Sequence, residues 1–150
     1  DGFRLDAVVM PALQALADRT GESASFYLRE GALRRCLFRV ESPQALRVHI
    51  RPGDSRPLDN SAIAQVLRHA GTGIVMPVFS AGATDPHTAG LAAPVFGPGQ
   101  SFRGALAITG PITRLTPESA AAAAPLLREA AAGVTAALGG AFPAGVRWSD

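Results

Sequence analysis

Apolar residues recur at the spacing of an amphipathic helix in three segments, residues 5–19, 60–69 and 117–138. Each segment places its large apolar side chains on one stripe, which should face a core. The residues expected on these inner stripes are Val9, Leu13 and Leu16; Ile63, Val66 and Leu67; and Leu126, Leu127, Ala130, Val134 and Leu138.

Polar residues and prolines mark the ends of these helices. Asp59 or Asn60 can cap the second helix, and Thr116 followed by Pro117 is a strong start for the third. Pro11 fits only near the start of the first helix or as a kink within it. Pro125 should kink the third helix, because an interior proline costs about 3 kcal/mol.

Short apolar segments between the helices predict strands. Three precede the second helix, at residues 23–29, 33–41 and 45–50, and three follow it, at residues 73–79, 90–96 and 102–109. Gly31 and the Gly97-Pro98-Gly99 turn indicate hairpins, and the Gly- and Thr-rich stretch 80–89 is expected to be a loop. Strict alternation in the second strand puts Arg34 and Cys36 on the same, more apolar face as Phe38 and Val40.

This element order predicts an α+β domain, with one antiparallel sheet of roughly six strands and helices packed against it. We expect a single domain over residues 1–140, followed by a loosely held C-terminal tail over residues 141–150. No internal repeat or interdomain linker stands out.

Composition narrows the class of protein. With 47% hydrophobic and 17% charged residues, the chain of 150 residues is neither disordered nor fibrous. No apolar stretch reaches the length of a membrane span, and no signal peptide is visible, which favours a cytoplasmic protein. Because the chain starts without methionine, we expect it to be a piece of a longer protein.

The charged residues argue against nucleic-acid binding by these residues alone. All 14 basic residues are arginines and the net charge is only +2. The arginines are scattered singly, apart from Arg34-Arg35, and form no basic stripe. The absence of lysine is typical of a GC-rich genome.

Residues that could carry catalysis are few. No histidine or cysteine stands at metal-ligand spacing from another histidine or cysteine, so no metal site is predicted. The residues considered are His49, His69, His87 and Cys36. Cys36 is expected to be a buried, inert thiol, and His87 to lie in a solvated loop. An enzyme using Cys36 or His87 is the least favoured hypothesis, and no catalytic residue is assigned.

The start of the second helix, residues 59–63, is a candidate binding site. Free N–H groups at a helix start favour a small anion such as a carboxylate. The alternative is that Asp59 or Asn60 caps the helix and occupies those groups.

Several stretches of the chain, which follow one another in the order found in the family, resemble the effector-binding domain of IclR-type (isocitrate lyase regulator) transcriptional regulators. The most specific is the stretch from Gly104 to Leu115, which resembles the family's "A-L-S-I-S-G-P-x-x-R-L" strand and turn. The stretch from Gly90 to Phe96 resembles its "G-I-A-A-P-V-F" strand. The other matching stretches are residues 11–24, 40–43, 46–48, 52–53 and 56–58.

The resemblance implies a GAF/PAS-like fold that binds a small organic or aromatic acid, needs no cofactor, and assembles as homodimers or tetramers. DNA binding would belong to an N-terminal winged helix-turn-helix domain absent from this chain. The effector-binding residues implied by position are Ala62, Ile63, Ser80, Gly90, Ala107 and Thr109.

The chain also departs from the family pattern. Positions near Ser80, Gly90 and Ala107 that are often acidic or polar are small or apolar here, which favours a less polar pocket. The segment after Leu67 lacks the extra helical residues usual in the family. A degenerate sensor fold with an occluded cavity, acting only as a ligand-independent oligomerisation module, is therefore the main alternative.

Overall fold

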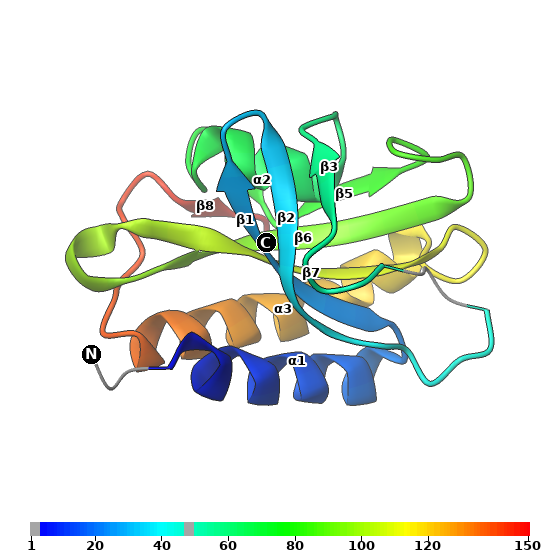
Figure 1. Ribbon diagram of the computed structural model, residues 1–150, viewed down its shortest axis with the longest axis horizontal. Coiled ribbons are helices and arrows are strands. Elements are labelled where there is room, and N and C mark those ends of the chain that lie inside the picture. Colours follow the sequence, from blue (N-terminus) through cyan, green and yellow to red (C-terminus); the bar gives the residue numbers. More distant parts are fainter. Residues whose placement is uncertain (1–3, 47–49) are drawn as a thin grey trace.

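The computed structural model describes residues 4–46 and 50–150. One six-stranded antiparallel sheet, in the order β3-β2-β1-β7-β6-β5, separates two helical layers. Helices α1 and α3 cover one face of the sheet and α2 lies over the other (Figure 1). This confirms the predicted α+β class. The elements are α1 (Leu5–Thr20), β1 (Ser23–Glu30), β2 (Leu33–Val40), β3 (Ser55–Pro57), α2 (Ala62–His69), β4 (Val75–Met76), β5 (Val78–Ala81), β6 (Thr88–Phe96), η1 (Pro98–Gln100), β7 (Phe102–Pro111), α3 (Pro117–Ala137) and β8 (Arg147–Trp148).

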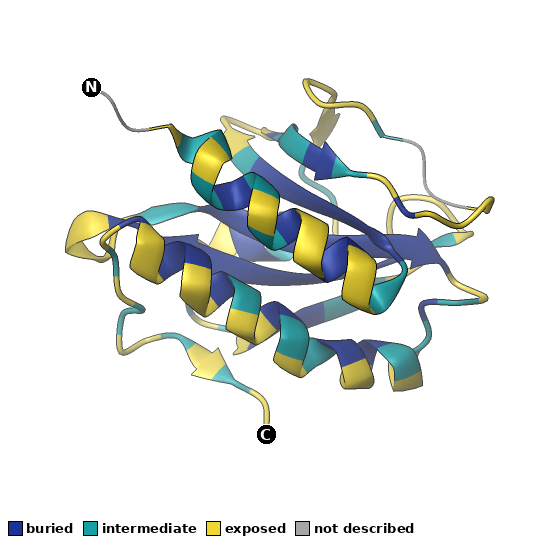
Figure 2. Cartoon of the chain, turned by 90° about the horizontal axis from the view of Figure 1, so that it is seen from below, coloured by how far each residue is buried: buried dark blue, intermediate teal, exposed yellow. Residues whose placement is uncertain are grey.

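The larger core lies between the sheet and the α1–α3 layer. In α1 the predicted stripe is buried, and the buried faces of α1 and α3 turn toward the sheet while their outer faces are exposed (Figure 2). The α3 stripe is rotated from the one predicted: Leu127, Ala131 and Val134 are fully packed, whereas Leu126 and Ala130 are half-buried.

Both helices continue through their prolines. Pro11 lies inside α1 and Pro125 inside α3, and each is exposed. The carbonyls that each proline leaves unpaired, on Ala7 and Ala121, also belong to exposed residues. Water can therefore replace the missing hydrogen bonds, which explains why neither proline ends its helix.

A β-bulge corrects the predicted faces of β2. Phe26 pairs with Phe38 but Tyr27 pairs with Cys36, so Leu37 is an extra residue opposite β1. Beyond the bulge the alternation is inverted: Phe38 packs into the α1–α3 core, and Arg39 shares the α2 face with Cys36. Nη1 of the buried Arg39 donates to Ser25 Oγ at 2.8 Å.

The strand predicted at residues 45–50 is not the third strand. Residues 47–49, including His49, lie outside the described residues, and the described residues of that segment are not in a strand. The third strand is β3, which lies at one edge of the sheet and pairs with the start of β2. The predicted loop 80–89 is shorter than expected, because β5 and β6 extend into it from both ends.

The C-terminal segment packs against the domain instead of hanging loosely from it. β8 pairs in parallel with β4, in the connection between α2 and β5. Trp148 stacks edge-on against Phe142 at 5.5 Å, and the Arg128 guanidinium lies 5.0 Å from the centre of the Trp148 ring. Val146 and Trp148 also contact the core beneath α2.

None of the helices in the described part of the chain has the length and apolar character needed to cross a membrane.

Candidate functional site

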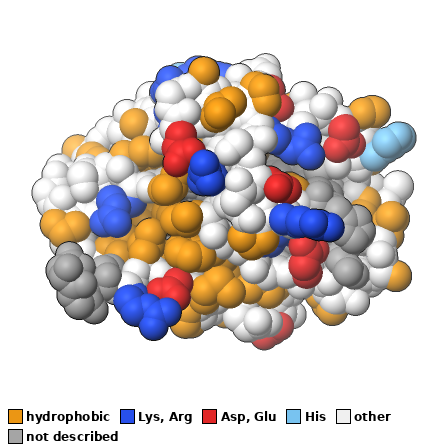
Figure 3. All heavy atoms as spheres, viewed as in Figure 1, with side chains coloured by type: hydrophobic (Ala, Val, Ile, Leu, Met, Phe, Trp, Pro, Cys, Tyr) orange, Lys and Arg blue, Asp and Glu red, His pale blue; other side chains and the backbone are white. Residues whose placement is uncertain are grey.

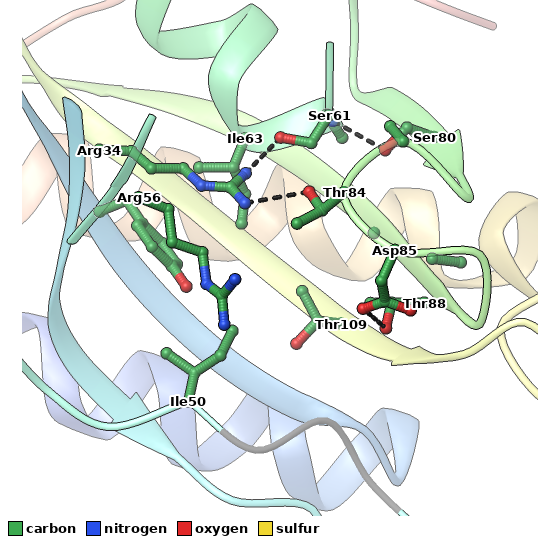
Figure 4. A pocket seen from close by; sticks show the side chains of 15 residues that line it. Arg34, Ile50, Arg56, Ser61, Ile63, Ser80, Thr84, Asp85, Thr88 and Thr109 are labelled. Carbon is green, nitrogen blue, oxygen red and sulfur yellow. Dashed lines mark hydrogen bonds between the residues drawn. The ribbon is translucent and has the colours of Figure 1, made fainter. Parts of the chain in front are cut away.

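A pocket of about 180 Å³ lies on the α2 face of the sheet. Its walls come from the start of α2, residues of all six strands of the main sheet, and the loop between β5 and β6 (Figure 4). The volume is close to that of a cavity that holds one benzene ring, about 150 Å³. The pocket therefore fits a small molecule rather than a peptide.

Five of the six effector-binding residues expected from the family resemblance line this pocket: Ala62, Ile63, Ser80, Gly90 and Thr109. They come from four different elements, so the fold brings them together from distant parts of the sequence. The sixth, Ala107, is fully buried in the core under α2 and is not among the lining residues.

The start of α2 is capped by Ser61 and not by Asp59 or Asn60. Ser61 Oγ accepts from the N–H of Ala64 at 3.3 Å, and Ser80 Oγ accepts from the N–H of Ala62 at 2.8 Å. These two serines occupy much of the hydrogen-bonding capacity that a free helix start would offer an anion. Asp59 instead accepts from the N–H of Ser61 at 2.9 Å.

Arg34 is the pocket residue that the sequence analysis missed as a functional group. Its side chain, from β2, is only 4% exposed and reaches three polar partners. Nη1 donates to Ser61 Oγ and lies 3.5 Å from Asp59 Oδ1, and Nη2 donates to Thr84 Oγ1 at 3.0 Å. Its signal in the sequence was a charged residue on the more apolar face of a strand.

The Asp59 carboxylate is held ionised beside Arg34. Burial by itself would raise the pKa of Asp59, but hydrogen bonds from Ser61 and Thr84 and the charge of Arg34 lower it overall. Thr84 Oγ1 donates to Asp59 Oδ2 at 2.7 Å, so the loop between β5 and β6 is tied to both charges.

Two buried polar atoms in the pocket walls have no partner among the described residues. They are Arg34 Nε and Thr109 Oγ1, on side chains 4% and 5% exposed. An unsatisfied buried polar group costs about 1–3 kcal/mol.

The pocket also contains charged side chains at positions that the family resemblance did not imply. Arg56, from β3, extends into it beside Arg34, and Asp85 and Thr88 lie on the far side (Figure 4). Hydrogen bonding from Thr88, with smaller effects from the N–H of His87 and the charges of His87 and Arg56, outweighs desolvation and lowers the pKa of Asp85. The expectation of a less polar pocket than is usual in the family stays a prediction, and these charged residues come from positions that it did not consider.

Cys36 and His87 lie in contrasting surroundings. Cys36 is fully buried in the core under α2, and its burial raises the pKa of its thiol. That environment is opposite to the one that activates a nucleophilic cysteine. His87 is exposed, in the loop before β6.

No group of three His, Cys, Asp or Glu side chains in the described ranges could hold a metal ion. On the face seen in Figure 3, arginine and acidic side chains are interspersed, without a continuous basic stripe.

No protein-family model and no curated protein sequence matches the chain. Solved structures do match. A protein assigned to the IclR transcriptional regulators of Silicibacter sp. TM1040 is 21% identical, with a TM-score of 0.82 over 95% of this chain and 70% of that one. The Thermotoga maritima IclR is 16% identical, with a TM-score of 0.76 over 92% and 70%.

The C-terminal domain of a protein assigned as a transcriptional regulator of Vibrio cholerae is 24% identical. Its TM-score is 0.72, over 89% of this chain and 97% of that domain. The matched region therefore corresponds to almost all of a separately studied C-terminal domain, and to about 70% of the longer regulators. At these identities the likeness concerns the fold, and the chain has the fold of the C-terminal domains of IclR-type transcriptional regulators.

Proposed function

We propose that this chain is the effector-binding domain of an IclR-type transcriptional regulator. In this proposal a small organic or aromatic acid enters the pocket at the start of α2, and its occupancy is passed to a DNA-binding part outside these 150 residues. The regulator acts in the cytoplasm as a homodimer or tetramer, and contacts DNA through a winged helix-turn-helix domain. No cofactor or catalytic step is required.

The observation that carries the proposal is the pocket itself. It lies where the family resemblance expected a ligand, and it contains two buried polar atoms, Arg34 Nε and Thr109 Oγ1, without a partner in the described residues. Buried polar atoms without a partner are uncommon in proteins, and their presence in residues that line the cavity supports ligand binding there. The shared fold supports the same assignment.

The alternative of a ligand-independent oligomerisation module predicts an occluded cavity. A pocket of about 180 Å³, lined by side chains of both charges, favours ligand binding instead. Sedimentation with and without ligand would distinguish the two: the alternative requires self-association that no small molecule changes.

The test is a thermal-shift screen of the chain against small acids, amines, alcohols and sugars. A ligand at about 100 times its Kd should add about 2.7 kcal/mol of stability, or roughly 5–10 °C in Tm for a domain of this size. Failure of every class to shift the Tm would contradict the proposal.

Two pocket variants then locate the binding site. Thr109→Val removes the unpaired hydroxyl and Ile63→Trp fills space at the start of α2, so each should reduce the shift. Thr113→Val and Ile112→Trp are matched controls at exposed positions outside the pocket lining. A shift unchanged in both pocket variants would place the ligand elsewhere.

A further inference from the structure

Two arginines face the pocket from paired positions on neighbouring strands. Arg34 of β2 lies directly opposite Arg56 of β3, and both line the cavity (Figure 4). Like charges at directly opposed positions weaken a sheet. A negative charge between them would convert this repulsion into attraction.

The end of the pocket that holds Arg34 and Arg56 keeps a net positive charge after the neighbouring acidic group is counted. The ionised Asp59 carboxylate, 3.5 Å from Arg34 Nη1, offsets one of the two positive charges. The side chain of Arg56 forms no ion pair or hydrogen bond with any residue in the ranges 4–46 and 50–150. One negative charge would therefore balance the pair and Asp59 together.

The hydrogen-bonding groups point to an acceptor at the same place. Nη1 and Nη2 of Arg34 are already used by Ser61 and Thr84, whereas the buried Nε is not. An arginine Nε can only donate. At the start of α2, Ser61 and Ser80 already accept from the N–H groups of Ala64 and Ala62. The strands therefore offer an acid group more than the helix start does.

The opposite end of the pocket has the opposite charge. Asp85 lies across the cavity from Arg34 and Arg56, and its lowered pKa keeps it ionised at neutral pH (Figure 4). Between the two ends lies Thr109, whose hydroxyl has no partner in the part of the chain that the structure describes. A ligand with a carboxylate at each end would bring one of them toward Asp85.

We propose that the pocket selects a monocarboxylate. Its carboxylate lies at Arg34 and Arg56, an uncharged polar group reaches Thr109, and Asp85 disfavours a second carboxylate. This inference rests on the proposed function, because it specifies the ligand of the same pocket. It assigns acid recognition to Arg34 and Arg56, neither of which is among the positions implied by the family resemblance.

The experiment measures binding of named probes to the 150-residue chain by titration calorimetry. The monocarboxylates are benzoate, 4-hydroxybenzoate and hexanoate, each compared with its neutral amide. The dicarboxylates are terephthalate and adipate. At least one monocarboxylate should bind at least tenfold more tightly than its amide and than the dicarboxylate of the same skeleton.

Variants assign the effect to the residues. Arg56→Gln should weaken the preferred acid at least tenfold and leave its amide unchanged, and Asp85→Asn should narrow the gap between monocarboxylate and dicarboxylate. Because Arg56 and Asp85 are exposed, both variants should fold. Arg35→Gln is the matched control, since Arg35 lies next to Arg34 on the other face of β2 and pairs with Glu30.

The outcomes separate the two proposals. If no monocarboxylate binds more tightly than its amide, or if Arg56→Gln and Arg35→Gln behave alike, the monocarboxylate inference is overturned. The effector-binding function survives that result if another compound class shifts the Tm in the wider screen, and fails with it if none does.

Discussion

Glu22 and Arg114, 92 residues apart in the sequence, are joined by two parallel hydrogen bonds. Arg114 Nε donates to Glu22 Oε2 at 2.6 Å, and Nη2 donates to Oε1 at 2.7 Å. The Glu22 side chain is 5% exposed and that of Arg114 is 30% exposed. This pair fastens the start of β1 to the turn that follows β7, and so holds together two strands that contribute to the pocket floor.

Replacing Glu22 should destabilise the fold more than replacing an acid in an exposed pair. Removing one partner of a buried ion pair costs about 3–5 kcal/mol, and the partial exposure of Arg114 reduces this to about 2–3 kcal/mol for Glu22→Gln. Glu30→Gln, which breaks the exposed Arg35–Glu30 pair, should cost less than about 1 kcal/mol. Urea unfolding measures both; equal losses would show that burial of the pair is unimportant.

Acid should weaken the fold through Asp59. Its pKa is lowered in the folded state, so its stabilising contribution is present above the unfolded-state pKa and is lost as the pH falls through the folded pKa. The loss belongs to the range below the unfolded-state pKa of about 3.9. Asp59→Asn should be less stable than the parent chain at pH 7 and approach it in this range. A constant difference in unfolding free energy across the range would refute the assignment.

The thiol of Cys36 should be unreactive in the native chain. It is fully buried and its raised pKa keeps it protonated at neutral pH, whereas disulfide-forming reagents attack the thiolate. Labelling with an aromatic disulfide at pH 8 should be slow in buffer and fast in denaturant. Rapid labelling under native conditions would contradict the buried position and reopen the hypothesis of a reactive cysteine.

Trp148 should report whether the C-terminal segment is docked. It is the only tryptophan, it is half-buried, and Phe142 packs against it. Acrylamide should quench its fluorescence less in the parent chain than in Phe142→Ala, which removes that contact. Phe38→Ala, which truncates an aromatic side chain that stacks on Phe26 instead of Trp148, is the control and should leave the quenching near the parent value. Identical quenching in all three chains would mean that the segment is undocked.

The amphipathic helices were predictable because their signals are local. The stripes of α1 and α2 follow from residues within a few turns of one another, and the Thr116-Pro117 start of α3 needs no distant partner. The resemblance of several stretches to IclR-type regulators added an expected ligand position, and five of the six implied residues line the pocket.

The charged half of the pocket depends on distant residues and could not be predicted in the same way. Arg34 meets Arg56 only because β3 pairs with β2 at that register, and it meets Thr84 only because the loop between β5 and β6 folds back over it. Arg34 had a local signal, as a charged residue on the more apolar face of its strand, but no local pattern distinguishes Arg56 among the 14 scattered arginines.

Leu37, the extra residue in β2, lets the two halves of the strand direct their side chains into different layers of the protein. Up to Cys36 the strand serves the pocket layer, and from Phe38 it fills the layer beneath α1. Loss of Leu37 would therefore turn neither half over. Cys36 and Phe38 would become adjacent, and ordinary alternation along the strand would keep Arg34 in the pocket and Phe38 in the core. A sequence alignment with a relative whose strand has no bulge must therefore place a one-residue gap here, because without it one half of the strand would be matched with residues of the opposite face.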